Sequence, residues 1–320
     1  MTQEPEIIKG ASLWADAYKR LLKNKLAVFG LIVIVFMSIA VIVGPPMIEA
    51  TSGFTYDKQP EQKELVKSFP PSFEHPMGTD DLGRDILARV LQGGRISLMV
   101  AVISTVMSLL IGVSYGAIAG YVGGFIDNLM MRIVDILFSI PYILIVIVLL
   151  SVFGGPNTPE WIKSISGRFG AENDQGLSQI FLLFFALGCV SWLTMARVVR
   201  GQILSLKNQD FVLAARATGV STPAIIFRHL VPNALGPVIV YATLTVPSVM
   251  LTEAFLSFLG LGVQPPYASW GSLAAEGIKA IGIYPWQMIF PGVTMALTLF
   301  SLNFLGDGLR DALDPQTRKF

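Results

Sequence analysis

The sequence predicts an all-α, polytopic membrane protein with six transmembrane helices. Of its 320 residues, 53% are hydrophobic and only 14% are charged, and the mean hydropathy is +0.63. A soluble domain carries about 25% charged residues, so this deficit indicates a chain that lies mostly in lipid. Several uncharged runs also reach the roughly 20 residues that a helix needs to cross a bilayer. The formal net charge of +1 gives no reason to expect a nucleic acid as partner.

Six apolar runs define the expected spans. The runs cover 26–44, 96–126, 136–154, 177–196, 233–261 and 280–306. We expect the first to form a helix over 26–48. A cleaved signal peptide is the alternative for this run, because basic residues precede it. The run is longer than a usual signal core, and five further spans follow it, so we expect a retained helix.

The polar segments divide the chain and suggest its orientation. Residues 1–25 form an amphipathic lead-in with a basic cluster, which favours a cytoplasmic N terminus. Residues 49–95 are then extracytoplasmic, and 96–306 form a five-helix core with a cytoplasmic loop over 197–233. Six spans return the tail, 307–320, to the cytoplasm. The segments 154–176 and 262–283 are outer loops, and the second could dip back into the membrane.

Glu253 is the only charged residue inside the fifth apolar run. An ionisable group at this depth is expensive, so one interpretation is a carboxylate that faces a pore or pairs with a partner. The other is a residue near the end of an overlong helix, whose carboxylate reaches the interface. The run alone does not decide between the two.

The sequence contains no recognisable reactive or metal-binding constellation. His75 and His229 have no ligand-type residues at suitable spacing, so we expect no metal and no cofactor. Cys189 lies in an apolar run and is expected to be a small buried hydrophobe. The phosphate-binding pattern GxxxxGK[ST] is absent, so the chain is not expected to be an enzyme that hydrolyses ATP. The spans also lack ion-coupling charges. A transporter of this kind must take its energy from a partner.

The longest stretch typical of water-soluble helix covers 210–233, between the fourth and fifth spans. Asp210 is expected to cap a helix over 211–218, and Gly219 to end it in the left-handed conformation. Pro232 and Asn233 are expected to break a second helix before the fifth span. An ordinary loop with a helix-friendly sequence is the alternative.

The first of these helices carries small side chains close together. Ala214, Ala215 and Ala217 would let its backbone approach a groove on a partner protein. AARATG (214–219), followed after nine residues by HLVP (229–232), resembles the signature loop of ABC importer permeases. That loop reads E-A-A, three residues, G, nine residues, I-x-L-P. Four residues match this pattern at the right spacing: Ala214, Ala215, Gly219 and Pro232. Three depart from it: Leu213, His229 and Val231.

Other segments are similar to the peptide and nickel branch of these permeases. They are HPMGTDDLGRDILARVLQGGRISL (75–98), ARVVRGQILSLKNQDF (196–211), FLSFLGLGVQPPYASWG (255–271) and NFLGDGLRDALDP (303–315). The resemblance runs from about Ser12 to Pro315 and is strongest to the C subunits of oligopeptide permeases. The 154–176 insertion departs from the shorter members of the branch.

The resemblance implies the type I ABC importer permease fold and a multi-pass protein of the bacterial inner membrane. It also implies a heterodimer with a second permease, two cytoplasmic ABC ATPases, an extracytoplasmic peptide-binding protein and a peptide substrate. The residues expected to couple the permease to an ATPase are Asp210, Phe211, Ala214, Ala215, Gly219 and Pro232. Because Leu213 replaces the family's Glu, we expect docking to depend on shape and small side chains more than on charge.

Three alternatives stay open at this point. The same architecture could carry dipeptides, nickel chelates or glutathione. A six-span channel or secondary transporter would work without ATPase partners, although the lack of mid-membrane charges disfavours it. A membrane-embedded enzyme would need a reactive constellation, which the sequence lacks.

Overall fold

The computed structural model describes residues 13–60, 67–154, 158–168 and 175–313. The regular structure of these residues is helical, apart from an isolated bridge between Thr79 and Asp85. The all-α prediction is therefore confirmed. In chain order the elements are α1 (Leu13–Lys23), α2 (Lys25–Ser52), α3 (Ile86–Val122), α4 (Gly124–Ser139), α5 (Tyr142–Phe153), α6 (Glu160–Arg168), α7 (Gln175–Leu206), α8 (Asp210–Ala217), α9 (Thr222–Ala224), the π-helical η3 (Ile225–Leu230), α10 (Val231–Phe258), α11 (Trp270–Gly277), the 3-10 helix η4 (Ile278–Ala280) and α12 (Trp286–Leu313).

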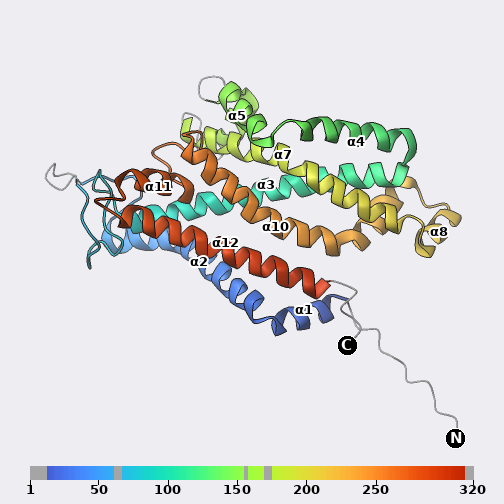
Figure 1. The fold of residues 1–320 in the computed structure, drawn as a ribbon, viewed down its shortest axis with the longest axis horizontal. Coiled ribbons are helices and arrows are strands. Elements are labelled where there is room, and N and C mark those ends of the chain that lie inside the picture. The colour runs from blue at the N-terminus through green and yellow to red at the C-terminus, as the bar shows by residue number, and fades with distance from the viewer. Residues whose placement is uncertain (1–12, 61–66, 155–157, 169–174, 314–320) are drawn as a thin grey trace, which may run out of the picture.

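Five of the described helices are long and apolar enough to cross a membrane. They are α2, α3, α7, the continuous helix that contains α10, and α12. Helices α4 and α5 pass the same test as a pair, so the described chain agrees with six spans when this pair counts as one. Figure 1 shows the long helices side by side, with α8 at one end of the bundle and α11 at the other. We call these the α8 end and the α11 end.

The third span differs from the single helix predicted over 136–154. Helix α4 begins at Gly124 and ends at Ser139, and α5 lies at 81° to it. Ile140 between them is extended, with φ −92° and ψ 128°, as expected for a residue before proline. Pro141 then has no N–H with which to continue α4. The prediction missed this break because the apolar run continues through it.

The closest helix packing is that of α3 against α7. Gly112, Gly116 and Gly120 follow at four-residue intervals on α3 and face α7. A Cβ at Gly116 would overlap the carbonyl oxygen of Ala196, and one at Gly120 would lie 3.0 Å from the carbonyl oxygen of Arg200. Small residues at this spacing let membrane helices approach backbone to backbone. The contacts advance in the same direction along both helices, so α3 and α7 run parallel.

Helices α1 and α2 lie along α12 (Figure 1). Asn24 caps α2 and accepts hydrogen bonds from the N–H groups of Leu26 and Ala27 at 3.1 and 3.2 Å. A Cβ at Gly308 of α12 would overlap the side chain of Ala27, so the two helices are in close contact. The first span is thus a helix as predicted, although it continues to Ser52. Of the predicted lead-in and tail, residues 1–12 and 314–320 lie outside the described residues.

The predicted outer loop over 262–283 contains a buried helix, α11. Ser269 caps it through a capping box: its hydroxyl accepts from the N–H of Ser272 at 3.0 Å, and its own N–H donates to the Ser272 hydroxyl at 2.8 Å. Trp270 is 0% exposed, and its indole N–H donates to the carbonyl of Val90 on α3 at 2.8 Å. Helix α11 therefore belongs to the core of the α11 end rather than to a surface loop. The other predicted outer loop, 154–176, contains α6, with 155–157 and 169–174 outside the described residues.

We expect Gly116→Ala to lower the thermal stability of the detergent-solubilised protein, because its methyl group would force α3 away from α7. Gly236 on α10 is the matched control: it is also helical, but a Cβ there meets no atom within 4 Å. Gly236→Ala should leave the midpoint unchanged or raise it, since alanine favours helix by up to about 1 kcal/mol. Thermal unfolding followed by tryptophan fluorescence measures both. Equal effects of the two substitutions would contradict the proposed contact.

Candidate functional site

Helix α8 lies at one end of the bundle, between α7 and α9 (Figure 1). The prediction that Asp210 caps it is wrong. Gln209 occupies the cap position, with φ −74° and ψ 153°, and its side chain makes no capping bond. Asp210 is instead the first helical residue, and its exposed carboxylate lies in the first turn, where the helix dipole favours a negative charge.

The end of α8 agrees with the sequence prediction. Gly219 has φ +77°, the left-handed conformation in which an L side chain is strained. Its N–H donates to the carbonyl of Arg216 at 3.0 Å, and the N–H of Val220 donates to the carbonyl of Ala215 at 3.0 Å. This pair of bonds is a Schellman motif, which fixes the direction in which the chain leaves the helix.

The two faces of α8 differ in their surroundings. Val212 and Ala215 are buried in an apolar cluster formed with α3, α7, η3 and α10. Phe211, Leu213 and Ala214 are exposed, and Leu213 shows 48% of its surface. Ala215 was expected to contact a partner, but it faces the protein's own core. The exposed apolar residues of α8 are Phe211, Leu213, Ala214 and Ala217, and we call the first three the α8 tip.

Polar contacts on and just before α8 also join this helix to the bundle. The Arg216 guanidinium donates from Nε to the Tyr121 hydroxyl at 3.2 Å and lies 5.0 Å from the centre of the Tyr121 ring. Lys207, just before α8, donates to the carbonyl of Gly120 at 3.0 Å. Both partners lie at the end of α3. A displacement of α8 would therefore be transmitted to α3 as well as to α7.

Pro232 does not break the helix before the fifth span, contrary to prediction. It lies in the first turn of α10, directly after the π-helical turn η3. The Val231 N–H donates to the Ile226 carbonyl, five residues back, and this wider register accommodates a residue without an N–H. Asn233 does not end the helix either, since its side-chain amide donates to the carbonyl of His229 at 2.6 Å.

A cavity of about 530 Å³ opens where α4 and α5 break. Its walls come from this break, from α7 and from α10. None of its lining side chains is charged, and those that are not hydroxyl-bearing are apolar. The hydroxyl-bearing residues are Tyr142, Ser191, Thr194, Tyr241, Thr245, Ser248 and Thr252. The cavity thus combines apolar walls with neutral hydrogen-bonding groups.

Two arginines of α7 fasten α4 near this cavity. Arg200 binds both carboxylate oxygens of Asp127, with an Nη2–Oδ2 distance of 2.7 Å. Arg197 donates to Asp135 at 2.7 Å, and its guanidinium lies 3.9 Å from the ring centre of Phe138, which lines the cavity. The two-point pair of Arg200 with Asp127 fixes orientation as well as distance, and Arg197 adds a single bond to Asp135. They hold α4 in place although most of its apolar side chains are exposed.

The structure contradicts the interfacial interpretation of Glu253 and pairs its carboxylate with hydroxyl groups of the chain. The residue is 1% exposed, so its carboxylate neither reaches the interface nor faces a pore. Its Oε1 accepts from the hydroxyls of Ser257 at 2.8 Å and Ser269 at 2.6 Å, and its Oε2 accepts from Ser97 at 3.5 Å. The Ser97 hydroxyl in turn accepts from the N–H of Trp270 at 3.0 Å. Glu253 therefore joins α10 to α3 and to the cap of α11.

The partners of Glu253 show what the sequence could reveal. Ser257 lies four residues further along the same helix, so helical spacing alone could have identified it. Ser97 and Ser269 come from α3 and from the cap of α11. Only the folded chain brings them to the carboxylate.

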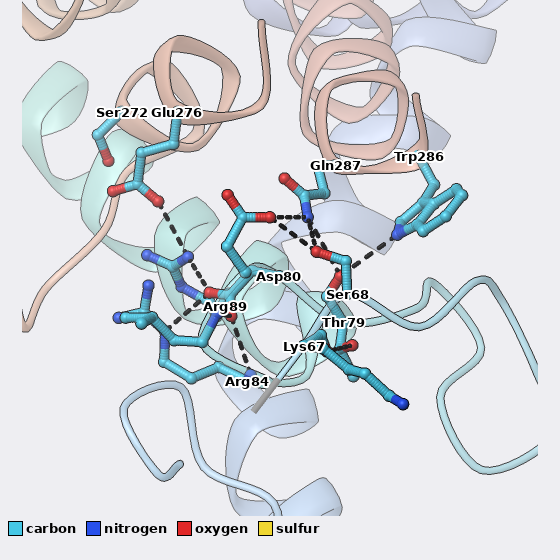
Figure 2. Close-up of polar contacts among 12 residues, drawn as sticks. Lys67, Ser68, Thr79, Asp80, Arg84, Arg89, Ser272, Glu276, Trp286 and Gln287 are labelled. Atoms are coloured by element: carbon cyan, nitrogen blue, oxygen red, sulfur yellow. Dashed lines mark hydrogen bonds and ion pairs between the residues drawn. The ribbon is translucent and has the colours of Figure 1, made fainter. Parts of the chain in front are cut away.

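The α11 end carries a charged network that the sequence did not reveal (Figure 2). Arg89 is buried, and its Nη1 donates to Asp80 at 2.6 Å and to Glu276 of α11 at 3.0 Å. The Nε of Arg84 donates to the same Asp80 oxygen at 2.7 Å. The network ties the segment before α3 to α11. Because each carboxylate has a cationic partner, these charges can lie in a largely buried setting.

Neighbouring polar contacts order the rest of this segment. Asp81 accepts from Gln287 at 3.0 Å and from Ser68 at 2.7 Å, and these hydrogen bonds hold the pKa of the Asp81 carboxyl below its usual range. His75 lies 2.8 Å from Asp85, which caps α3. Among the described residues, no group of three or more His, Cys, Asp or Glu side chains is placed to hold a metal ion.

Comparison with known proteins shows that this bundle of apolar spans is a transport permease. Residues 112–319 match the family described as the binding-protein-dependent transport system inner membrane component. Residues 12–71 match the N-terminal TM domain of oligopeptide transport permease C. The chain belongs to the first of these families, as its signature loop suggested.

Relatives of known function cover nearly the whole chain. The oligopeptide transport system permease protein OppC of Escherichia coli K12 is 46% identical over 313 residues, covering 97% of this chain and 94% of that protein. OppC of Bacillus subtilis is 45% identical over 311 residues, with 97% and 92% coverage. The dipeptide permease protein DppC of B. subtilis is 41% identical over 321 residues, with 99% and 91% coverage. A chain of the MetNI methionine ABC transporter, crystallised in an inward-facing conformation, has a similar fold, with a TM-score of 0.50 and 21% identity over 72% of this chain and 98% of that one.

We expect Glu253→Leu to destabilise the α11 end, because it leaves the hydroxyls of Ser97, Ser257 and Ser269 without their acceptor. An unsatisfied buried polar group costs about 1–3 kcal/mol. Glu253→Gln should be much milder, since its amide oxygen still accepts and serine hydroxyls can rotate. Limited proteolysis of the 259–269 segment and thermal unfolding measure the difference. Equal effects of Leu and Gln would show that the serine contacts contribute little.

Proposed function

We propose that this chain is a permease subunit of an ATP-driven importer and forms half of the translocation pathway for oligopeptides. Support comes from the OppC proteins, which align with 97% of the chain at 45–46% identity. The neutral cavity between α4–α5, α7 and α10 suits a cargo whose side chains vary. The 41% identity with DppC makes a dipeptide importer the second candidate.

The α8 tip is the proposed contact with a cytoplasmic ATPase. Phe211, Leu213 and Ala214 are exposed, while Val212 and Ala215 anchor the helix to α3, α7 and α10. An exposed apolar tip on a firmly attached helix can transmit movement as a rigid body. Asp210, Gly219 and Pro232 act indirectly in this proposal: they shape the two ends of the hairpin that presents the tip.

Leu213 gives the proposed contact a particular chemistry. The signature loop of the family has a glutamate there, whereas this chain presents a half-exposed leucine. A leucine beside Phe211 favours an apolar cleft on the ATPase, and the contact should depend little on ionic strength. The ATPase surface that receives this tip would then lack the cationic partner that a glutamate would need.

The proposed orientation places the α8 end in the cytoplasm. Arg310 and Leu313 near the end of α12 share a pocket with Val198 of α7 and Pro237 of α10, so α12 ends beside these two helices, toward the α8 end. Helix α1 lies toward the same end in Figure 1. Basic residues gather in the lead-in and in the 197–233 loop, which favours the cytoplasmic side for both termini.

The proposed assembly contains partners that supply what the chain lacks. The full sequence has no GxxxxGK[ST] loop, so ATP hydrolysis is assigned to two separate ATPase subunits. A second, related permease would complete the pathway opposite the cavity. An extracytoplasmic binding protein would deliver the peptide to the α11 end. The chain itself is then a transport subunit and not an enzyme.

Reconstitution in proteoliposomes tests the proposal. The complete importer should take up labelled tetra-alanine only when ATP and the binding protein are present, and collapse of ion gradients with ionophores should have no effect. Uptake that follows an ion gradient and needs no ATPase would support a secondary transporter. Comparison with dialanine separates the oligopeptide cargo from the dipeptide cargo.

Gly219→Val should weaken the association with the ATPases about tenfold, because a β-branched residue at φ +77° costs about 1–3 kcal/mol and would displace the tip. Gly219→Asn is the matched control, since asparagine tolerates the left-handed conformation. Co-purification of the ATPases and peptide-stimulated ATP hydrolysis measure the effect. Normal values for the valine variant, at normal membrane levels, would refute the role of this turn.

A further inference from the structure

The hydroxyl groups of the cavity form an ordered row along α10. Tyr241, Thr245, Ser248 and Thr252 line the cavity and follow at intervals of four, three and four residues, so they share one face of the helix. Ser191 faces them from α7. At 1.5 Å per residue, Thr245 and Thr252 are separated by about 10 Å along the helix. This is the length of about three residues of an extended peptide.

The hydrogen bonds of these hydroxyls decide what they can bind. Thr245 donates its proton to the carbonyl of Tyr241 at 2.8 Å, Ser248 to that of Leu244 at 3.2 Å, and Ser191 to that of Leu187 at 2.8 Å. A hydroxyl has one proton and two lone pairs, so each of these oxygens keeps lone pairs for a further donor. Ser191, Thr245 and Ser248 therefore offer acceptors to the cavity.

The hydroxyl of Thr252, the last in the row, also donates its proton to a carbonyl of its own helix. Thr252 donates to the carbonyl of Ser248 at 2.9 Å, so in its 2.8 Å contact with Tyr142 the phenol is the donor. Tyr142 lies directly after the helix break, so this bond also fixes the start of α5 against α10. The acceptor row thus ends at the break that opens the cavity.

A ligand that fits this wall has several N–H donors in a row and needs no counter-charge. The amide N–H groups of a peptide main chain have this chemistry, and leaving them unpaired in an apolar site would be costly. We infer that the row Thr245, Ser248 and Thr252, with Ser191 opposite, is a subsite that binds the main-chain N–H groups of the passing peptide. The inference rests on the proposed peptide import and names which part of the peptide this subunit recognises.

Recognition of the main chain explains how one cavity can pass peptides of different sequence. The apolar part of the wall includes Phe138, Leu187 and Val249. These residues can make van der Waals contacts with the side chains of a peptide, and such contacts require no particular orientation. No fixed charge lines the cavity, so acidic and basic side chains meet no opposite charge that would retain them. The hydroxyls supply weak, neutral bonds that every peptide can make.

The test measures whether wall hydroxyls and peptide N–H groups act together. The complete importer in proteoliposomes is assayed with tetra-alanine and with the same peptide N-methylated at its three amides. Wild type is compared with Thr245→Val plus Ser248→Ala. The binding protein also distinguishes the two peptides, but it does so equally for both permeases, so its effect cancels in the ratio of initial rates.

We expect the double variant to lower the uptake of tetra-alanine about tenfold and that of the methylated peptide less than twofold, since each lost hydrogen bond accounts for a factor of several. Thr243→Val is the matched control. Thr243 lies on the same helix and donates to the carbonyl of Ile239 at 2.9 Å, but it does not line the cavity. This variant should behave as wild type with both peptides.

The remaining outcomes separate this inference from the proposed function. If the double variant lowers the uptake of both peptides by the same factor, or changes neither, the main-chain subsite alone is overturned. Loss of co-purification with the second permease would assign the hydroxyl row to the subunit interface and would also overturn the subsite. Absence of ATP-dependent uptake in wild type would overturn the proposed function and the subsite with it.

Discussion

The contact between α3 and α7 through Gly112, Gly116 and Gly120 supports most other features of the molecule. In lipid there is no hydrophobic effect to press helices together, so close van der Waals contact has to provide the attraction. The remaining faces of α7 make other contacts. One face holds α4 through Arg197 and Arg200, another forms a wall of the cavity, and the end of the helix supports α8.

The lipid environment also explains why buried polar groups of the bundle pair with one another. Backbone and side-chain polar atoms in an apolar core need partners within the chain, and three polar or irregular sites of the bundle have them. Three serines surround Glu253, the π-helical turn accommodates Pro232, and arginines pair with the two aspartates of α4. At the break before α5, Ile140, Pro141 and Tyr142 line the cavity.

The α8 tip and the cavity are linked by continuous elements. Val212 and Ala215 pack on the ends of α3 and α7, and η3 continues without interruption into α10, which carries the hydroxyl row. Helix α8 is thus in contact with the same long helices that form the walls of the cavity. At the α11 end, Arg89 and Glu253 hold α11 against α3 and α10, so the two ends of the bundle are attached by different chemistry.

The sequence by itself determined the helical class, the number of spans, the family and the left-handed turn at Gly219. These features depend on local composition, on spacing and on the conformational freedom of single residues. Tertiary structure alone decided that Ala215 faces inward, that Glu253 binds serines from α3 and from the cap of α11, and that Asp127 and Asp135 meet arginines of α7. It also decided where the third span breaks, because Pro141 can kink, end or interrupt a helix according to its neighbours. Partners that are distant in sequence leave no local pattern, so only the folded chain reveals them.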